Sequence, residues 1–193
     1  MKRATSAVLI IVVLALGAFW LISQSPGTAP TPGPAVELPT ATDQIPPAAA
    51  DLSRPATATL SHVAYVHDGD TLYLQPDGTT SRADEITVRL LGLDTPELRP
   101  SVECFAVEAR DHLRALLPQG AEVWILADKG LLDKYGRSLL YLWTKDGHFV
   151  NMDLVANGYA TALRIKPNEA YWPELRDAET AARAKNLGQW GHC

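Results

Sequence analysis

The residues of this sequence best suited to chemistry lie in three short polar segments. These are His-Asp-Gly-Asp-Thr at 67–71, Arg-Leu-Leu-Gly-Leu-Asp-Thr-Pro-Glu at 89–97 and Asp-Lys-Tyr-Gly-Arg at 133–137. Every segment contains carboxylates, and two contain an arginine. Carboxylate oxygens bind hard cations such as Ca²⁺ or Mg²⁺, and a guanidinium fork matches two oxygens of a phosphate. The three segments are therefore suited to metal-assisted chemistry on a phosphate ester.

The carboxylates of interest are Asp70, Asp94 and Glu97. Each is expected at or just after the end of a strand, where loops present side chains to a ligand. Oxygen donors of this kind suit a divalent cation. The alternative for each one alone is that Asp-Gly and Asp-Thr-Pro simply form turns, and the residues themselves leave that choice open.

The two arginines admit two readings each. Arg89 stands within an apolar strand, where its charge requires an anionic partner, either a phosphate or an internal salt bridge to Asp94 or Glu97. Arg137 follows Gly136, which would let the chain approach a ligand, but Arg137 could equally be a solvated charge in a turn. If the ligand is a phosphate ester, these arginines and carboxylates supply what hydrolysis needs. Hydrolysis requires an aligned water, positive charge over the phosphorus and a carboxylate that orients or deprotonates the water.

The elements that must position these residues follow from hydrophobic periodicity. The patterns predict strands at 59–66, 71–75, 85–93, 121–126 and 138–143, and helices at 103–117, 151–157 and 172–186. Five short strands with an inserted helix favour an α+β fold, a closed five-stranded β-barrel of the OB type with three helices.

Two further segments precede the expected domain, which covers residues 57–193. Residues 1–24 contain Lys2-Arg3 followed by an uncharged apolar run, typical of a signal anchor or signal peptide, and the sequence favours an uncleaved anchor. Residues 25–56 are rich in Pro, Ala and Thr and are predicted to be a disordered linker. We therefore expect an extracytoplasmic domain that is anchored to the membrane, or secreted if the first segment is cleaved.

The chain has two cysteines, Cys104 and Cys193, and no C-x-x-C pair, which argues against a structural zinc site. In an oxidising compartment, two thiols with no third tend to form a bridge. A disulfide between them is therefore predicted, and it would pin the C-terminal end of the chain near the start of the first helix. The charge balance of 17 Lys+Arg against 22 Asp+Glu argues against a protein that coats nucleic acid through bulk charge.

The three polar segments, in this order and at these separations, resemble the thermonuclease (staphylococcal nuclease) family over residues 57–190. The resemblance implies an OB barrel with three helices and a Ca²⁺ site made by the side chains of Asp70 and Asp94 and the carbonyl of Thr95, with Asp68 close behind. It also implies the following roles at the phosphate: Arg89 and Arg137 grip it, Glu97 acts on the attacking water as base or orienter, and Lys134 and Tyr135 lie along the nucleotide.

The reaction implied by this resemblance is cleavage of DNA and RNA that leaves 3′-phosphates. We expect a monomer, with no obligate protein partner evident in the sequence. One departure is Leu163, which stands where the family often carries a base-stacking tyrosine. The rival hypothesis is a non-catalytic nucleic-acid- or protein-binding module on the same barrel. Such a module should lose the arginines or the glutamate. Because all three are present with both aspartates, the sequence favours the enzyme.

Overall fold

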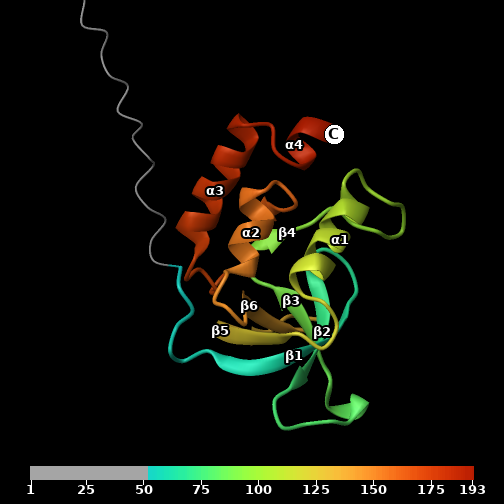
Figure 1. Ribbon diagram of the computed structural model, residues 1–193. Helices are drawn as coiled ribbons and strands as arrows, with labels where there is room; N and C mark the ends of the chain where they lie inside the picture. The colour runs from blue at the N-terminus through green and yellow to red at the C-terminus, as the bar shows by residue number, and fades with distance from the viewer. Residues whose placement is uncertain (1–51) are drawn as a thin grey trace, which may run out of the picture. The chain divides into compact units, whose positions relative to one another are not determined.

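The computed structural model describes residues 52–193, so the N-terminal apolar run and most of the expected linker lie outside the described residues (Figure 1). Within residues 52–193, no helix combines the length and the apolar character that a membrane crossing requires. The Leu52 carbonyl accepts a 2.8 Å hydrogen bond from Trp143 Nε1, and the Arg54 guanidinium lies 4.2 Å from the centre of the Trp124 ring. The last residues of the expected linker therefore contact the folded domain.

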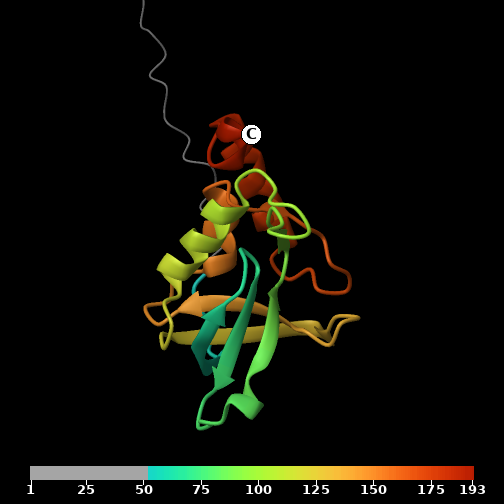
Figure 2. The same ribbon diagram turned by 90° about the vertical axis from the view of Figure 1, so that its right-hand side faces the viewer.

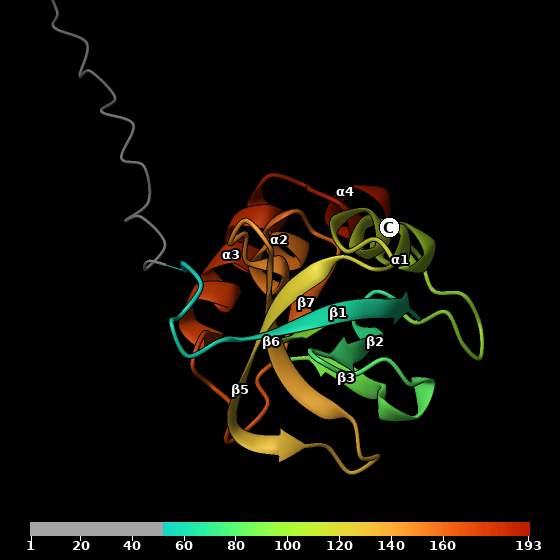
Figure 3. The same ribbon diagram turned by 60° about the horizontal axis from the view of Figure 1, so that its bottom comes forward.

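Five strands close into a barrel in the order β1-β2-β3-β6-β5 (Figure 3). They are β1 (Thr59–Val66), β2 (Thr71–Pro76), β3 (Ile86–Leu90), β5 (Glu122–Leu132) and β6 (Ser138–Thr144). Strands β3 and β6 pair in parallel, and the other neighbours pair antiparallel. The predicted five-stranded barrel is confirmed.

The inner and outer faces of the barrel follow from the period-two pattern of its strands. Leu72 and Leu74 of β2 and Val88 of β3 are fully buried in the barrel core. The residues between them, such as Tyr73 and Thr87, are only partly buried and point the other way. The outer face of β1, β2 and β3 is therefore open to a ligand.

The three predicted helices are present, and they gather at one end of the barrel (Figures 1 and 2). They are α1 (Ala106–Leu116), α2 (Val150–Ala156) and α3 (Trp172–Ala184), and a single turn, α4 (Gln189–His192), follows. The buried amide of Asn151 fixes α2 to the barrel: its Oδ1 accepts from Leu142 N and its Nδ2 donates to the Leu91 carbonyl, both at 2.9 Å. The helices thereby cap the core. The outer face of β6 is covered as well, because Leu139, Tyr141 and Trp143 are buried against Phe149 and Tyr171.

The largest differences between predicted and observed boundaries have local reasons, and the other boundaries shift by one or two residues. The strand predicted at 85–93 ends at Leu90, because the chain turns at Gly92 with φ +80°, a conformation that favours glycine. It resumes as β4 (Leu93–Asp94), which pairs with β7 (Thr161–Ala162) in a separate two-stranded sheet. The helix predicted from residue 103 begins at Ala106, since Phe105 is left-handed with φ 72°. Strand β5 runs on to Leu132 because the β5–β6 hairpin continues past an irregularity in its register.

The short 3₁₀ helix η1 (Arg82–Asp84) lies in the loop between β2 and β3 and was not predicted. Its Ser81 side chain accepts a hydrogen bond from Ala83 N, an interaction too local to leave a periodic signal in the sequence.

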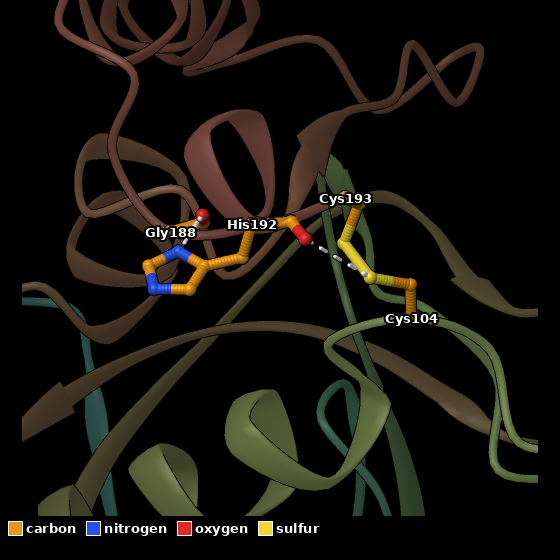
Figure 4. The surroundings of a disulfide bond; sticks show 4 residues. All are labelled: Cys104, Gly188, His192 and Cys193. Carbon is orange, nitrogen blue, oxygen red and sulfur yellow. Dashed lines mark hydrogen bonds between the residues drawn. A yellow bond between two sulfur atoms is a disulfide. The ribbon is translucent and has the colours of Figure 1, made fainter.

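The predicted disulfide between Cys104 and Cys193 is present, with the two Cα atoms 5.9 Å apart (Figure 4). It joins the segment before α1 to the end of α4, across 89 residues of sequence. The Phe105 ring packs beside it against Tyr159 and His192, at centroid distances of 5.5 and 5.4 Å. The bridge therefore holds the C-terminal turn against α1.

Replacing both cysteines by alanine should lower the free energy of unfolding by up to about 4–5 kcal/mol, because a loop of this length is left open in the unfolded chain. Urea denaturation of the oxidised protein, the reduced protein and the double variant measures this. Reduced protein and double variant should agree. An unchanged unfolding midpoint in both would contradict a stabilising role for the bridge.

Candidate active site

The buried guanidinium of Arg89 is the centre of the polar cluster on the barrel surface. Its Nη1 lies 2.9 Å from Asp70 Oδ2, and its Nη2 lies 2.5 Å from Asp94 Oδ1. Arg89 is only 7 % exposed, as its charge balance by two carboxylates allows. The internal ion pair left open by the sequence is thus present, with Asp94 as an expected partner and Asp70 as an additional one.

The strand register explains why these groups meet. Val88 and Leu90 face the core, so Arg89 faces outward beside Thr71, its cross-strand partner on β2. The backbone N–H of Leu90 also donates to the Asp70 carbonyl at 2.9 Å. The start of β2 and the end of β3 are therefore fixed side by side.

Asp70 is almost fully buried and accepts several hydrogen bonds. Its Oδ2 accepts from the backbone N–H and the hydroxyl of Thr95, both at 3.1 Å, and its Oδ1 accepts from the Thr71 hydroxyl at 3.0 Å. Burial raises the pKa of Asp70 from 3.8 to about 6, and the neighbouring charge of Asp68 adds to this, while Arg89 opposes it. The cluster thus holds an anion whose charge is only partly compensated.

The loop between β1 and β2 is shaped by Asp68 and Gly69. Asp68 Oδ1 accepts from Asp70 N at 3.1 Å and from Thr71 N at 2.7 Å, which is an Asx-type turn. At Gly69 a Cβ atom would come within 2.8 Å of all three side-chain atoms of Thr95, so only glycine allows the two loops to lie this close. Asp68 was expected close behind a metal ion. In the structure its side chain accepts the hydrogen bonds that shape the loop between β1 and β2.

The β5–β6 hairpin supplies Arg137 and projects beyond the barrel (Figure 2). Asp133 anchors it: its Oδ1 accepts from the backbone N–H groups of Tyr135 and Arg137 at 2.9 Å, and its Oδ2 accepts from Arg137 Nε at 2.7 Å. Burial alone would raise the pKa of Asp133, but these hydrogen bonds outweigh it and lower that pKa. Gly136 has φ +81° and no atom near its Cβ position, so it serves the left-handed turn and not a close approach.

A continuous path of polar contacts joins the two arginines. Arg137 Nη1 donates to the Thr71 hydroxyl at 3.3 Å, and that hydroxyl donates in turn to Asp70, which pairs with Arg89. Thr71 and Asp133 are not among the site residues predicted from the sequence. Both lie inside the polar segments, but their contacts depend on strand pairing, and Thr71 and Arg137 are 66 residues apart.

The remaining predicted residues lie around this path. Glu97 is exposed, and its loop is closed by two 2.9 Å hydrogen bonds with Glu103: Glu97 N donates to Glu103 Oε2, and Glu103 N donates to the Glu97 carbonyl. Partial burial and the like charges of Asp68 and Asp94 raise the pKa of Glu97. On the hairpin, Tyr135 is 72 % exposed, with Lys134 Nζ 4.9 Å and the Arg137 guanidinium 5.6 Å from its ring centre.

The chemistry of the donor set fits a hard cation. Asp68, Asp70, Asp94 and Glu97 interact electrostatically around Arg89, so negative charge is in excess when all four are ionised. Within residues 52–193, no group of three or more His, Cys, Asp or Glu side chains is arranged to hold a metal by itself. Ca²⁺ commonly completes its shell with carbonyls and water, so Asp70 and Asp94 with the Thr95 carbonyl would be sufficient protein ligands.

The comparison with known families concerns this same surface. The profile described as "Staphylococcal nuclease homologue" matches residues 87–192, more than half of the chain. The chain belongs to the staphylococcal nuclease family. The matched range contains Arg89, Asp94, Glu97 and Arg137, whereas Asp70 precedes it and joins the site through its contacts with Arg89 and Thr95.

Individual relatives agree with this family. Thermonuclease of Staphylococcus intermedius is 35% identical over 131 residues, which cover 66% of this chain and 74% of that protein. Thermonuclease of Staphylococcus hyicus is 32% identical over 133 residues, covering 67% of this chain and 75% of that protein. Endonuclease YhcR of Bacillus subtilis is 32% identical over 137 residues, which are 65% of this chain and only 11% of that protein.

Adding a divalent cation should stabilise the folded protein, because it neutralises the excess of carboxylate charge. At a concentration about 100-fold above the dissociation constant, the gain is about 2.7 kcal/mol. Thermal denaturation with Ca²⁺, compared with NaCl at equal ionic strength, measures it. Asp94→Asn should remove most of the gain, and Asp177→Asn, at an exposed position on α3, should leave it intact. An equal gain in both variants would mean that the cation binds elsewhere.

Proposed function

We propose that this protein is a Ca²⁺-dependent nuclease that hydrolyses phosphodiester bonds of DNA and RNA and leaves 3′-phosphates. Family membership supports nuclease activity. The observation that carries the proposal is the path Arg137–Thr71–Asp70–Arg89–Asp94, which gathers two guanidinium groups and two carboxylates beside Glu97 at the barrel surface.

Arg137 is the residue best prepared to bind phosphate. Its Nε and Nη1 are engaged by Asp133 and Thr71, and within residues 52–193 no hydrogen bond of its Nη2 is recorded. The side chain is 29 % exposed, so it is held in place and still reachable. A guanidinium fixed in this way presents donors to a phosphate with little loss of side-chain entropy.

Besides its proposed contact with the phosphate, Arg89 has a structural role. It compensates Asp70 and Asp94, so its donors are shared with carboxylates. A bound Ca²⁺ would take over part of that compensation and would add positive charge over the phosphorus of the transition state. Arg89 could then direct its donors towards the phosphate while remaining anchored.

Glu97 stands where it can act on the water. Partial burial raises the pKa of Glu97, and a raised pKa makes the ionised carboxylate a better proton acceptor than that of an ordinary glutamate. Water attacks phosphorus, the bond to the 5′-oxygen breaks, and that oxygen leaves as an alcohol after gaining a proton. The phosphate stays on the 3′ side. Glu97 would contact the attacking water in the same way whether it takes the proton of that water or only orients it.

The proposed protein acts outside the cytoplasm as a monomer. The apolar run near the N-terminus supports an extracytoplasmic monomer tethered to a membrane, or released if the segment is cleaved. The disulfide supports an oxidising compartment, since such bridges persist there. A reporter fused after Cys193 that works only in the cytoplasm would contradict this placement.

Cleavage of single-stranded DNA, duplex DNA and RNA should require Ca²⁺ and stop in excess EGTA. Mg²⁺ should substitute poorly because it demands tight octahedral geometry and loses water reluctantly. End-group analysis of the products should find 3′-phosphates and 5′-hydroxyls. Full activity in EGTA would refute the metal, and binding without cleavage under every condition would favour the non-catalytic module.

Arg137→Ala should lower kcat by at least about 100-fold, because charge that develops on the phosphate loses a positioned donor. Arg137→Lys should recover little of this, since an ammonium lacks the planar fork. The matched control is Arg176→Ala, an exposed arginine on α3 whose loss should leave kcat unchanged. Near-normal turnover by Arg137→Ala, with the fold intact by circular dichroism, would refute the phosphate role.

A further inference from the structure

A row of aromatic side chains lies on the outer face of the barrel next to the carboxylates of the site. Tyr65 of β1 and Tyr73 of β2 are cross-strand partners whose ring centres are 6.3 Å apart, at an angle of 36°. His67, in the following loop, packs edge-on against Tyr73 at 6.4 Å. Tyr65 is 50 % exposed, so part of its ring can be reached by a ligand.

Two hollows flank these rings. One, of about 440 Å³, runs from Asp68 and Glu97 past Arg99 to Tyr65, and the other, of about 430 Å³, continues from Tyr65 to Tyr73 and Arg82. Both are lined by Tyr65 and His67, so they form one groove that we call the tyrosine groove. Each hollow lies in the size range of small-ligand sites, about 300–1,000 Å³. The groove starts at the carboxylates of the site and leads away from them.

The charges along the tyrosine groove suit a polyanion. Within residues 52–193, no side-chain hydrogen bond or ion pair is recorded for exposed Arg82 or Arg99. Arg114 stacks 5.5 Å over the Tyr65 ring and donates to its hydroxyl at 3.1 Å, which fixes the ring in place. Of the acidic neighbours, Asp111 is paired with Arg110 at 2.8 Å, and Glu85 lines the far hollow.

We propose that the tyrosine groove binds unpaired nucleotides of the substrate strand, beyond those held at the scissile phosphate. Aromatic rings on an open barrel face, interleaved with arginines, bind single strands by stacking on the bases and pairing with the phosphates. In a duplex, neighbouring base pairs cover both faces of each base, so the rings select a strand that is single or locally opened. This inference rests on the proposed nuclease function and specifies the form of substrate that the site prefers.

The groove is built by other segments than the nucleotide site implied by the family resemblance. Lys134 and Tyr135 belong to the β5–β6 hairpin, whereas Tyr65, Tyr73 and Arg99 come from β1, β2 and the loop after Glu97. None of the groove residues contacts the hairpin in the recorded interactions of residues 52–193. A strand whose cleaved phosphate sits near Arg137 would therefore have a second surface for its nucleotides, separate from the hairpin.

Binding is the first test, and it uses the full chain carrying Glu97→Gln so that the probe is not cut. The probe is a fluorescein-labelled single-stranded DNA of about ten nucleotides, within the range that one such barrel covers, followed by anisotropy in Ca²⁺. Tyr65→Ala and Tyr73→Ala should each weaken binding about tenfold, and Tyr65→Phe and Tyr73→Phe should bind almost as well as the parent. The same sequence as a duplex should respond to none of these changes.

Tyr65 and Tyr73 also join two strands, so their alanine variants could lose stability. Arg99→Gln avoids this because Arg99 is exposed and, within residues 52–193, its side chain makes no hydrogen bond or ion pair. It should reduce the slope of log affinity against log salt concentration by about 0.7, the value for one phosphate contact of a single strand. Arg176→Gln on α3 is the control and should leave the slope unchanged. An unchanged slope in Arg99→Gln, or equal losses in the phenylalanine and alanine variants, would overturn the proposal.

A cleavage assay distinguishes failure of the tyrosine groove from failure of the proposed nuclease function. With Glu97 restored, the ratio of kcat/KM for a long single strand to kcat/KM for a dinucleotide should fall about tenfold in Tyr65→Ala, chiefly through KM for the long strand. If the parent protein cleaves neither substrate, the proposed function fails while the binding test still decides on the groove. If the parent cleaves both and the ratio stays constant in every groove variant, only the groove is refuted.

Discussion

The charge of Arg89 is the constraint on which the architecture of this site depends. A guanidinium that is 7 % exposed must be compensated, and two carboxylates from different segments do so. Asp70 directly precedes β2 and Asp94 ends β4, so the ion pairs fix the β1–β2 loop and the small second sheet to β3. The same contacts that satisfy the arginine thus set the positions of the groups proposed to bind cation and phosphate.

The carboxylates around Arg89 carry more negative charge than the arginine compensates, and a bound cation can neutralise the excess. Several carboxylates face one arginine, and burial together with like charges raises the pKa of Asp70 and of Glu97. Alone, the cluster would repel a phosphate. A bound divalent cation would engage the carboxylates and leave the arginines available to the phosphate, so that cation and substrate should favour each other's binding. The acidic composition of the chain is therefore compatible with a polyanionic substrate.

Much of the fold and the membership of the site could be predicted from the sequence, because alternating strands and three clustered polar segments are local signals. Arg89 stood out as a charge in an apolar strand. The contacts that organise the site are non-local: Thr71 meets Arg137 only after β2, β3 and β6 are paired. The Tyr65–Tyr73 pair likewise depends on strand register, and the left-handed Phe105 that delays α1 has no local signature. The disulfide was predictable because two cysteines allow one pairing.

The disulfide has one more consequence, which concerns damage to the chain. Because it joins Cys104 to Cys193, every peptide bond between these residues lies inside a covalent ring that includes the hairpin bearing Arg137. A protease that cuts once within this ring produces two pieces that stay attached, with strand pairing and helix packing still holding them in register. A single nick in the exposed hairpin therefore need not release any fragment, whereas a cut between Asp94 and Cys104 leaves the first three barrel strands without a covalent link to the ring.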